Sequence, residues 1–305
     1  MVVDLSSTTF GAGLAGLAAF GFAIQYVCIR MGTTDGSVDD AVLVTLLCNV
    51  ALIVPLVTVV YREDLFNLFT GTALAAFAGA GLVGLCLARI CLFTGVKLIG
   101  ASRTSPVAAS NVLFATVFAF IFLGERVTIA HLAGIVLVVI GVAALSLETT
   151  ANERAEKSLR EAGTALAFPV AAALLIGIEP ILISIGLTEG TPILAGLAVM
   201  TLIGTMGFLG YWIVARQTLT VTWRGPVLWW YVGAGIAATV AFVAYLLALE
   251  VTTVVVVMPI LQTNPLIVLV LSTLFLPAHL ERVTWRLGVA ACIIVLGATI
   301  VSVVG

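Results

Sequence analysis

Two ionisable side chains interrupt long apolar runs of this sequence. Glu179 lies in the run 165–187, and Arg89 lies in the run 71–95. A charged side chain inside a hydrocarbon core costs on the order of 2.5 to 3.5 kcal/mol, so such a residue is expected to serve a function. The carboxylate of Glu179 could bind an amine or a proton, and the guanidinium of Arg89 could bind an anionic group. The two could also pair with each other, which would lower the cost of both and weaken the case for a bound solute.

The composition places these residues in a multi-pass membrane protein. Of the 305 residues, 62% are hydrophobic and 9% are charged, and the mean hydropathy is +1.26. So few charges cannot cover a soluble surface. The net charge of -2 and the lack of a basic cluster argue against nucleic acid as a partner. Residues 1–9 carry no Lys or Arg and so lack the basic start of a cleaved signal, and we expect the first apolar run to be retained.

No residue pattern points to an enzyme, a metal or a cofactor. The five cysteines lie within apolar runs and show no short paired spacing of the metal-binding or redox kind. Neither histidine belongs to a His-Glu-x-x-His motif, and the chain has no nucleophile elbow, phosphate loop or dinucleotide glycine pattern. We therefore expect a protein that is not an enzyme and needs no cofactor.

Ten apolar runs of roughly 20 residues are long enough to cross a hydrocarbon core of about 30 Å as helices. They are 10–31, 41–61, 71–95, 105–123, 129–147, 165–187, 193–215, 227–248, 254–275 and 287–304. The predicted fold class is thus an all-α membrane protein with ten transmembrane helices. Because the longest polar segment separates the fifth run from the sixth, the predicted domains are 10–148, a polar linker at 149–163, and 164–304.

The two five-helix halves resemble each other in sequence. Asn111 returns as Asn264, at an offset of 153 positions, and each has a proline five positions before it. The segment 32–36 returns at 186–190, at an offset of 154. A period of this size indicates a duplicated half-protein rather than a solenoid. Because each copy crosses the membrane an odd number of times, the second copy is inserted upside down, as is typical of transporters whose site lies near the midplane.

Uncharged polar side chains occur at a similar depth in the apolar runs. They are Gln25, Asn49, Ser110, Asn111, Gln262, Thr263 and Asn264. The commonest role of such groups is an interhelical hydrogen bond, usually worth under about 2 kcal/mol. Gln25, Asn111 and Asn264 are the stronger candidates for a solute site because their positions recur. The repeat aligns Gln25 with Glu179 and Asn111 with Asn264, around a common centre.

Short motifs in both halves resemble a known family. The segment 95–106 reads GVKLIGASRTSP and is followed by a Gly-Glu-Arg turn at 124–126, and the first run ends with Arg30 before Gly32. In their order and duplication these motifs resemble the EamA repeat of the drug/metabolite transporter superfamily. The resemblance covers nearly the whole chain. It implies ten transmembrane helices arranged as two inverted five-helix EamA-like repeats.

The second copy departs from this pattern at several positions. It lacks the glycine before Glu281, and Ala290 stands where the first copy has Gly134. In the first run, Phe22 stands where a tryptophan is common in the family. These differences bear on subfamily and substrate more than on fold, because the family spans amino acids, nucleobases, sugars, sugar phosphates and toxic compounds. Membership in the family does not name the solute.

We therefore predict a secondary transporter of the cell membrane that moves a small polar metabolite across the lipid bilayer by alternating access. An exported amino-acid-like solute is the first choice, because a zwitterion would use both charges. The predicted substrate site consists of Gln25, Tyr26, Arg89, Asn111, Glu179, Tyr245 and Asn264. A coupling proton is a further candidate partner, and the oligomeric state is left open. The alternative is a non-transporting membrane scaffold or sensor, which would have no solute-accessible cavity.

The orientation in the membrane is open, because two arguments disagree. If both termini were cytoplasmic, as the resemblance implies, the cytoplasmic loops would hold only Arg62 and Arg126. The loops on the opposite side would hold ten of the 13 basic residues. The positive-inside rule therefore favours termini that face out of the cell.

Overall fold

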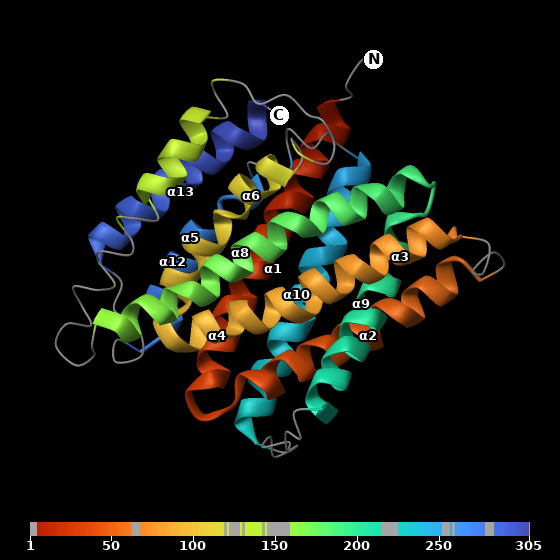
Figure 1. The fold of residues 1–305 in the computed structure, drawn as a ribbon, viewed down its shortest axis with the longest axis horizontal. Coiled ribbons are helices and arrows are strands. Elements are labelled where there is room, and N and C mark those ends of the chain that lie inside the picture. The colour runs from red at the N-terminus through yellow and green to blue at the C-terminus, as the bar shows by residue number, and fades with distance from the viewer. Residues whose placement is uncertain are drawn as a thin grey trace.

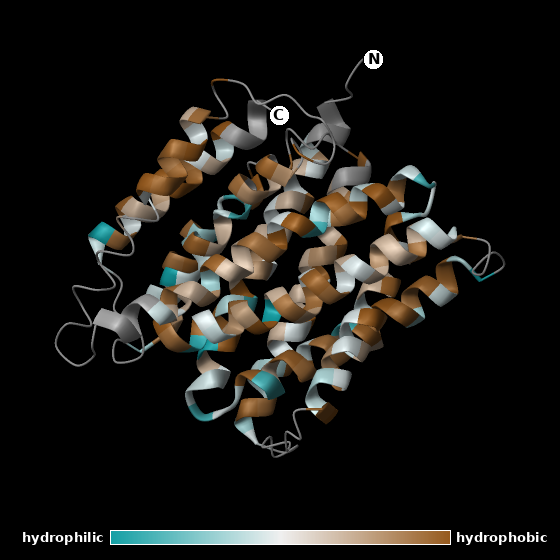
Figure 2. Cartoon of the chain, in the orientation of Figure 1, coloured by the Kyte–Doolittle hydropathy of each residue, from teal (hydrophilic) through white to brown (hydrophobic). Residues whose placement is uncertain are grey.

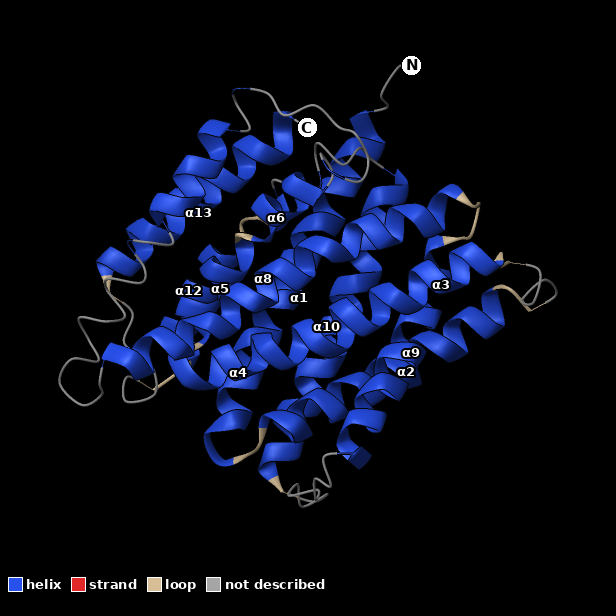
Figure 3. Cartoon of the chain, viewed as in Figure 1, coloured by secondary structure: helices blue, strands red, loops and turns tan. Residues whose placement is uncertain are grey.

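The computed structural model describes residues 5–62, 68–118, 121, 129, 132–141, 144, 159–214, 225–251, 257, 260–277 and 284–304. Over these residues the chain consists of helices and connecting turns, with no strand (Figure 3). The predicted all-α class is therefore confirmed for the described part of the chain. Both histidines, the turn at 124–126 and most of the predicted linker lie outside the described residues.

The helices follow the order of the apolar runs. They are α1 (Leu5–Asp35), α2 (Val38–Val60), α3 (Gly71–Ala80), the π-helix η1 (Gly81–Ala88), α4 (Arg89–Ile99), α5 (Ala101–Ala109), α6 (Asn111–Phe118), α8 (Leu159–Thr188), α9 (Ile193–Val214), α10 (Pro226–Val251), α12 (Asn264–Phe275) and α13 (Trp285–Val304). α3, η1 and α4 form one continuous span from Gly71 to Ile99. The described chain is thus a bundle of helices (Figure 1).

The described helices include six that are long and apolar enough to cross a membrane. They are Thr9–Asp35, Val38–Val60, Gly71–Ile99, Thr164–Thr188, Ile193–Val214 and Pro226–Ala248, with shorter apolar helices at Leu132–Gly141, Asn264–Phe275 and Trp285–Ile300. Many large apolar side chains are exposed, as expected where lipid is the solvent. Figure 2 shows that hydrophobic residues extend along most of the helices. The chain is a multi-pass integral membrane protein. Its ten crossings stay a prediction.

Several predicted helices, among them 10–31, 105–123 and 165–187, have different bounds in the structure. The predicted helix 105–123 begins earlier, at Ala101, and is divided at Ser110 into α5 and α6. The predicted helix 165–187 also begins earlier, at Leu159, inside the predicted linker. Leu, Arg, Glu and Ala are good helix formers, so the helix continues beyond the apolar run. Hydropathy located these spans but not the helix ends, and the division into domains stays a prediction.

The helix break in the first half has a counterpart in the second. The amide of Ser110 donates to the carbonyl of Val107 at 3.1 Å, and the Ser110 hydroxyl donates to the same carbonyl at 2.6 Å. At an offset of 153, the amide and hydroxyl of Thr263 donate to the carbonyl of Ile260 at 3.0 and 2.6 Å. These three-residue turns interrupt the α-helical pattern. The repeat found in the sequence is therefore present in the backbone hydrogen bonds.

The helix pairings also repeat between the two halves. α1 packs along α10, whereas α8 packs along the span formed by α3, η1 and α4. α2 and α9, the second helices of the two halves, pack against each other. Figure 1 shows α8 alongside α3 and α4, and it places the start of α1 and the end of α13 at the same end of the bundle. The pair formed by α1 and α10 is thus equivalent to the pair formed by α8 and the span of α3, η1 and α4, and α2 is equivalent to α9.

Two aromatic side chains hold these helix pairs together at equivalent glycines. The ring of Tyr231 occupies the space beside Gly32, and the ring of Phe77 occupies the space beside Gly186. Both the glycines and the aromatic residues are 154 positions apart, and both rings are fully buried. Glycine lets the partner helix approach closely, which matters in a membrane because packing replaces the hydrophobic drive between helices.

Replacement of Gly32 by alanine is expected to destabilise the protein, because the added Cβ would overlap the Tyr231 ring. Gly16, in the same helix, has open space at its Cβ position and provides the control. Overpacking typically destabilises by about 1 to 3 kcal/mol, whereas Gly to Ala in a helix is otherwise favourable by about 1 kcal/mol. Thermal-shift measurements in detergent should show a lower Tm for Gly32→Ala and an unchanged or higher Tm for Gly16→Ala. Equal Tm values would contradict the close packing.

Candidate functional site

Arg89 lies where the third span changes its helical form. It is the first residue of α4 and directly follows the π-helix Gly81–Ala88. A π-helix turns the side chains that follow it relative to a regular α-helix, and such segments are frequent at functional sites. The Arg89 side chain is 4% exposed, so its charge is buried in the bundle. The sequence predicted the residue but not the π-helix before it.

Asn49 of α2 accepts hydrogen bonds from both ends of this guanidinium. The Asn49 amide is assigned in the orientation that satisfies its neighbours, with its oxygen facing Arg89. Nη1 and Nη2 of Arg89 then donate to Asn49 Oδ1 at 3.1 Å each. Asn49 Nδ2 donates to Thr239 Oγ1 at 2.9 Å and to the Thr45 carbonyl at 3.1 Å. A neutral network from α2 and α10 therefore holds the buried cation.

Glu179 of α8 lies against the π-helix. A side chain at Gly84 would overlap the carboxyl carbon and both oxygens of Glu179, so the carboxyl group occupies the space that the glycine leaves. Glu179 Oε1 is buried and has no hydrogen-bond partner among the described residues. A buried carboxylate oxygen without a donor is unfavourable, so this group calls for a proton or a cationic ligand.

The charges of Arg89, Glu179 and the hydroxyl of Tyr245 are brought together by three different helices. Glu179 interacts electrostatically with Arg89 and with Tyr245 of α10. Within the described part of the chain, no salt bridge of 4.0 Å or less joins Glu179 to Arg89. The direct pairing considered from the sequence is therefore not the observed arrangement. The two charges interact at a distance longer than that of a salt bridge.

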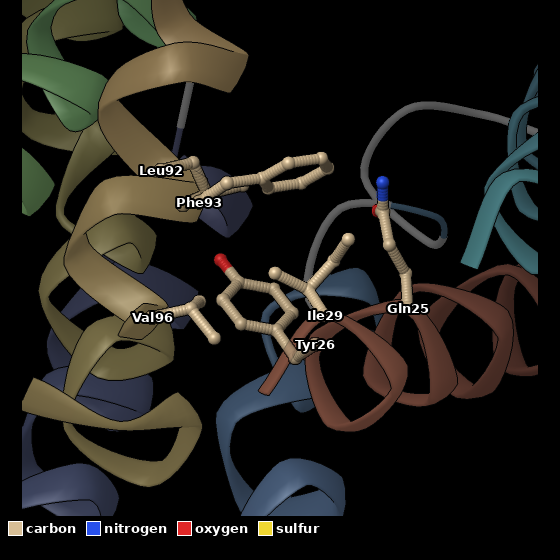
Figure 4. A pocket seen from close by; sticks show the side chains of 6 residues that line it. All are labelled: Gln25, Tyr26, Ile29, Leu92, Phe93 and Val96. Atoms are coloured by element: carbon tan, nitrogen blue, oxygen red, sulfur yellow. The ribbon is translucent and has the colours of Figure 1, made fainter. Parts of the chain in front are cut away.

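Gln25 and Tyr26 lie in a crevice between α1 and α4. Figure 4 shows the Tyr26 ring reaching toward α4, with Gln25 and Ile29 beside it. The facing residues are Leu92, Phe93 and Val96, which follow Arg89 by three, four and seven positions and so lie on its face of the helix. The crevice is narrow and has no room for a water-sized molecule in this conformation.

Asn111 and Asn264 begin the helices that follow the two breaks. Asn264 Nδ2 donates to the carbonyl of Ala19 in α1 at 2.8 Å. The Asn111 carbonyl lies against Gly177 of α8, two positions before Glu179. Each asparagine thus contacts the first helix of the opposite half, Asn264 through its side chain and Asn111 through its backbone. The contact of Asn264 is an interhelical hydrogen bond of the kind expected for polar residues in membrane helices. A role for either in solute binding stays a prediction.

Arg30 joins the ends of α1 and α4 at one end of the bundle. Its Nη1 donates to the carbonyls of Val96 at 3.2 Å and Lys97 at 2.6 Å. Lys97 Nζ donates in turn to the carbonyl of Gly36, just after α1, at 3.1 Å. A cation near the last carbonyls of a helix is favourable. We call these contacts of Arg30 and Lys97 the latch, and they lie directly past the crevice at Val96.

The opposite end of the bundle is joined by other contacts. Thr70 Oγ1 donates to a carboxylate oxygen of Glu189 at 2.9 Å, and Thr191 Oγ1 donates to the carbonyl of Leu68 at 2.8 Å. These bonds connect the loops that follow α2 and α8. The residue equivalent to Arg30 in the second half is Ser184, which carries no charge. The two ends of the bundle are thus held by chemically different contacts.

Some of the site residues could not be chosen from the sequence. Asn49 was visible as a polar residue inside an apolar run, but nothing marked its contact with Arg89. Thr239 and Gly84 gave no signal, because threonine and glycine are common in membrane helices and a single sequence does not show which helices face each other. Within the described residues, no cluster of three or more His, Cys, Asp and Glu side chains could hold a metal ion.

Comparison with known proteins is in agreement with this architecture. The EamA-like transporter family matches the chain twice, at residues 9–147 and 163–303. A solved crystal structure, described only as that of a protein, shares 19% sequence identity and covers 96% of each chain with a TM-score of 0.64, which shows a similar fold. It is one of 17 matching chains of solved structures. No significant match was found among curated proteins.

The two family matches cover almost the whole chain and correspond to the two halves whose helix breaks and pairings repeat. The family is one of membrane transporters. The chain belongs to the EamA-like transporter family.

Proposed function

We propose that this protein is a secondary transporter of the cell membrane that carries a small zwitterionic, amino-acid-like metabolite. The observation that carries the proposal is the pair of Arg89, which is buried, and Glu179, which is half-buried with its Oε1 atom fully buried; the two interact electrostatically without a salt bridge. A zwitterion has a carboxylate for the guanidinium and an ammonium group for the carboxylate. It would therefore satisfy two charges inside the bundle that the protein leaves apart.

A proton is the second ligand we propose for Glu179. When the solute leaves, the buried carboxylate loses its cationic partner, and a proton can neutralise it in place. Protonation and binding of the ammonium group would then exclude each other at the same oxygen atoms. Such competition would couple the movement of the solute in one direction to the movement of a proton in the other. Export of the solute is the direction we propose.

Alternating access is the proposed mechanism on the basis of the predicted inverted repeat, which follows from an odd number of crossings in each half. Supporting this, the repeated breaks at Ser110 and Thr263 occur in equivalent helices, and equivalent helices make the principal contacts. In the present conformation the latch lies across the outer end of the α1–α4 crevice. We infer that this end of the path is closed and that it opens when α1 and α4 separate.

Glu179→Gln is expected to abolish the coupling of transport to protons and to reduce uptake of a mixture of radiolabelled L-amino acids by about tenfold, equal to roughly 1.4 kcal/mol. The reason is that the amide keeps the size of the side chain but removes its charge. Uptake into proteoliposomes, with and without a pH gradient, is the measurement. Glu189→Gln, in a loop at the bundle end, is the matched control. Unchanged uptake and pH dependence would remove Glu179 from the mechanism.

Gly84→Ala is expected to have a similar effect on uptake without touching a charge. The new methyl group would overlap the Glu179 carboxyl group, which must then move. Gly79→Ala in α3 is the control, because its Cβ would meet Leu182 at an ordinary distance of 3.5 Å. Loss of uptake by about tenfold in the first variant only, with both folded by size-exclusion chromatography, is the expected result. Equal uptake by both variants would contradict the placement of the carboxyl group.

Arg30→Gln should open the latched end of the path more often. Hydrogen bonds to charged groups contribute about 1.5 to 3 kcal/mol, so labelling of a buried thiol past the latch should accelerate by about tenfold or more. The thiol is introduced as Ile29→Cys in a variant without the five native cysteines, and its reaction with a water-soluble maleimide is followed. Ser184→Ala, at the equivalent position of the second half, is the control. An unchanged labelling rate would show that Arg30 does not close this end.

A further inference from the structure

We propose that Asn49 is a positioning residue that keeps the charge of Arg89 available for the carboxylate of the solute. This inference rests on the proposed function, since it concerns the same site. Asn49 touches the guanidinium and not the solute. It acts by satisfying the hydrogen-bond donors of Arg89 without cancelling its charge.

The chemistry of the acceptor is the basis of this proposal. A buried guanidinium is most often paired with a carboxylate, which accepts two hydrogen bonds and also neutralises the charge. Here the acceptor of both terminal nitrogens is an amide oxygen, at 3.1 Å from each. An amide has no net charge. Two of the five N–H donors of Arg89, one on each terminal nitrogen, therefore have an acceptor, while its positive charge has no direct counter-ion in the described part of the chain.

The amide is itself fixed in the orientation that this role requires. The Thr239 hydroxyl donates to the Gly235 carbonyl at 2.9 Å, so its oxygen is free to accept from Asn49 Nδ2. The Thr45 carbonyl accepts the second proton of the same amide nitrogen at 3.1 Å. With both protons of Nδ2 engaged, only Oδ1 can face Arg89. Asn49 is fully buried and Thr239 is 5% exposed, so water does not compete for these bonds.

The charges around Arg89 agree with this assignment. Glu179 and Cys86 are the titratable side chains that act on Arg89 electrostatically in the described part of the chain. Glu179 makes no salt bridge with it, and its carboxyl group lies at Gly84 instead. A direct carboxylate partner for Arg89 is therefore left to be supplied by the bound solute.

The specificity consequence can be tested with a nearly isosteric change. Asn49→Asp would place a permanent carboxylate at the same distance from both nitrogens, and this internal carboxylate would take the place of the solute's. Asn49→Ser and Thr239→Val are milder variants. They introduce no negative charge beside Arg89, but they remove hydrogen bonds that fix the position of its side chain. All three variants leave the charged side chains of Arg89 and Glu179 unchanged.

The experiment compares three probes by thermal shift of the purified full-length protein, since a ligand of the folded state raises its apparent stability. The probes are a mixture of L-amino acids, the matched mixture of their decarboxylated amines, and propionate, which carries a carboxylate alone. In Asn49→Asp we expect the apparent affinity for amino acids and for propionate to fall by about tenfold or more, with the affinity for the amines retained. Asn49→Ser and Thr239→Val should weaken carboxylate binding several-fold more than amine binding.

The outcomes separate this inference from the proposed function. Amino-acid and propionate affinities in Asn49→Asp equal to those of the unmodified protein would overturn the role of Asn49, even if transport depends on Glu179. An equal loss for all three probes in the folded variants would show that Asn49 is structural only and would also overturn it. Loss of propionate binding in Asn49→Asp, in a protein that binds no amino acid, would support Asn49 and overturn the amino-acid proposal. If Asn49→Asp does not fold, the two milder variants decide by the same comparison.

Discussion

The constraint on which the rest of the site depends is the burial of the Arg89 charge in a membrane bundle. An ion taken out of water loses its hydration, and a protein usually offsets that loss with a counter-ion and further hydrogen bonds. Here the hydrogen bonds come from the neutral amide of Asn49, and the nearest acidic group acts from a distance. The helices that hold this arrangement are α2, α4 and α10, so two helices of the first half and one of the second must stay in contact around it. The electrostatics of the site therefore depend on the packing between the two halves.

The packing between helices is achieved in an equivalent way in both halves, but with different side chains. Tyr231 on Gly32 and Phe77 on Gly186 are equivalent contacts, yet only the tyrosine carries a hydroxyl, which lies 3.1 and 2.9 Å from the carbonyls of Gly32 and Ser37. In the same way, Glu179 in the second half has Gln25 as its counterpart in the first. The contacts that the two halves share are made by apolar and small residues. The polar groups that distinguish the two halves are additions to it, which is why they are candidates for function.

The sequence was informative where the signal was local and less so where it depended on contacts. Arg89 and Glu179 were identifiable because a charge in an apolar run is expensive. The recurrence of Asn111 at Asn264 indicated the repeat, but the helix breaks just before these residues were not predicted. The π-helix before Arg89 was not predictable, because its eight residues are as apolar as any other part of the span. Asn49, Thr239 and Gly84 could not be joined to the site, because which helix faces which is decided by tertiary packing. Gln25 and Tyr26 were predicted together and do line one crevice, although its other wall is apolar.

The asymmetry between the two ends bears on how such a protein can work. In a perfect inverted repeat the two mouths would open at equal free energy, and the unloaded protein would spend equal time facing each side. Under the proposed mechanism the latch would break this equality, because Arg30 donates hydrogen bonds to the end of α4 whereas Ser184 stands at the equivalent place. A ligand shifts such an equilibrium only by its difference in affinity for the two states. The proposed solute at Arg89 and Glu179 would lie one to two turns from the crevice beside the latch. It would act on helix α4, whose far end the latch holds. Binding of the solute could therefore provide that difference in affinity. Under the proposed mechanism, the latch would set the resting state, and the gradients of solute and proton would set the net direction of transport.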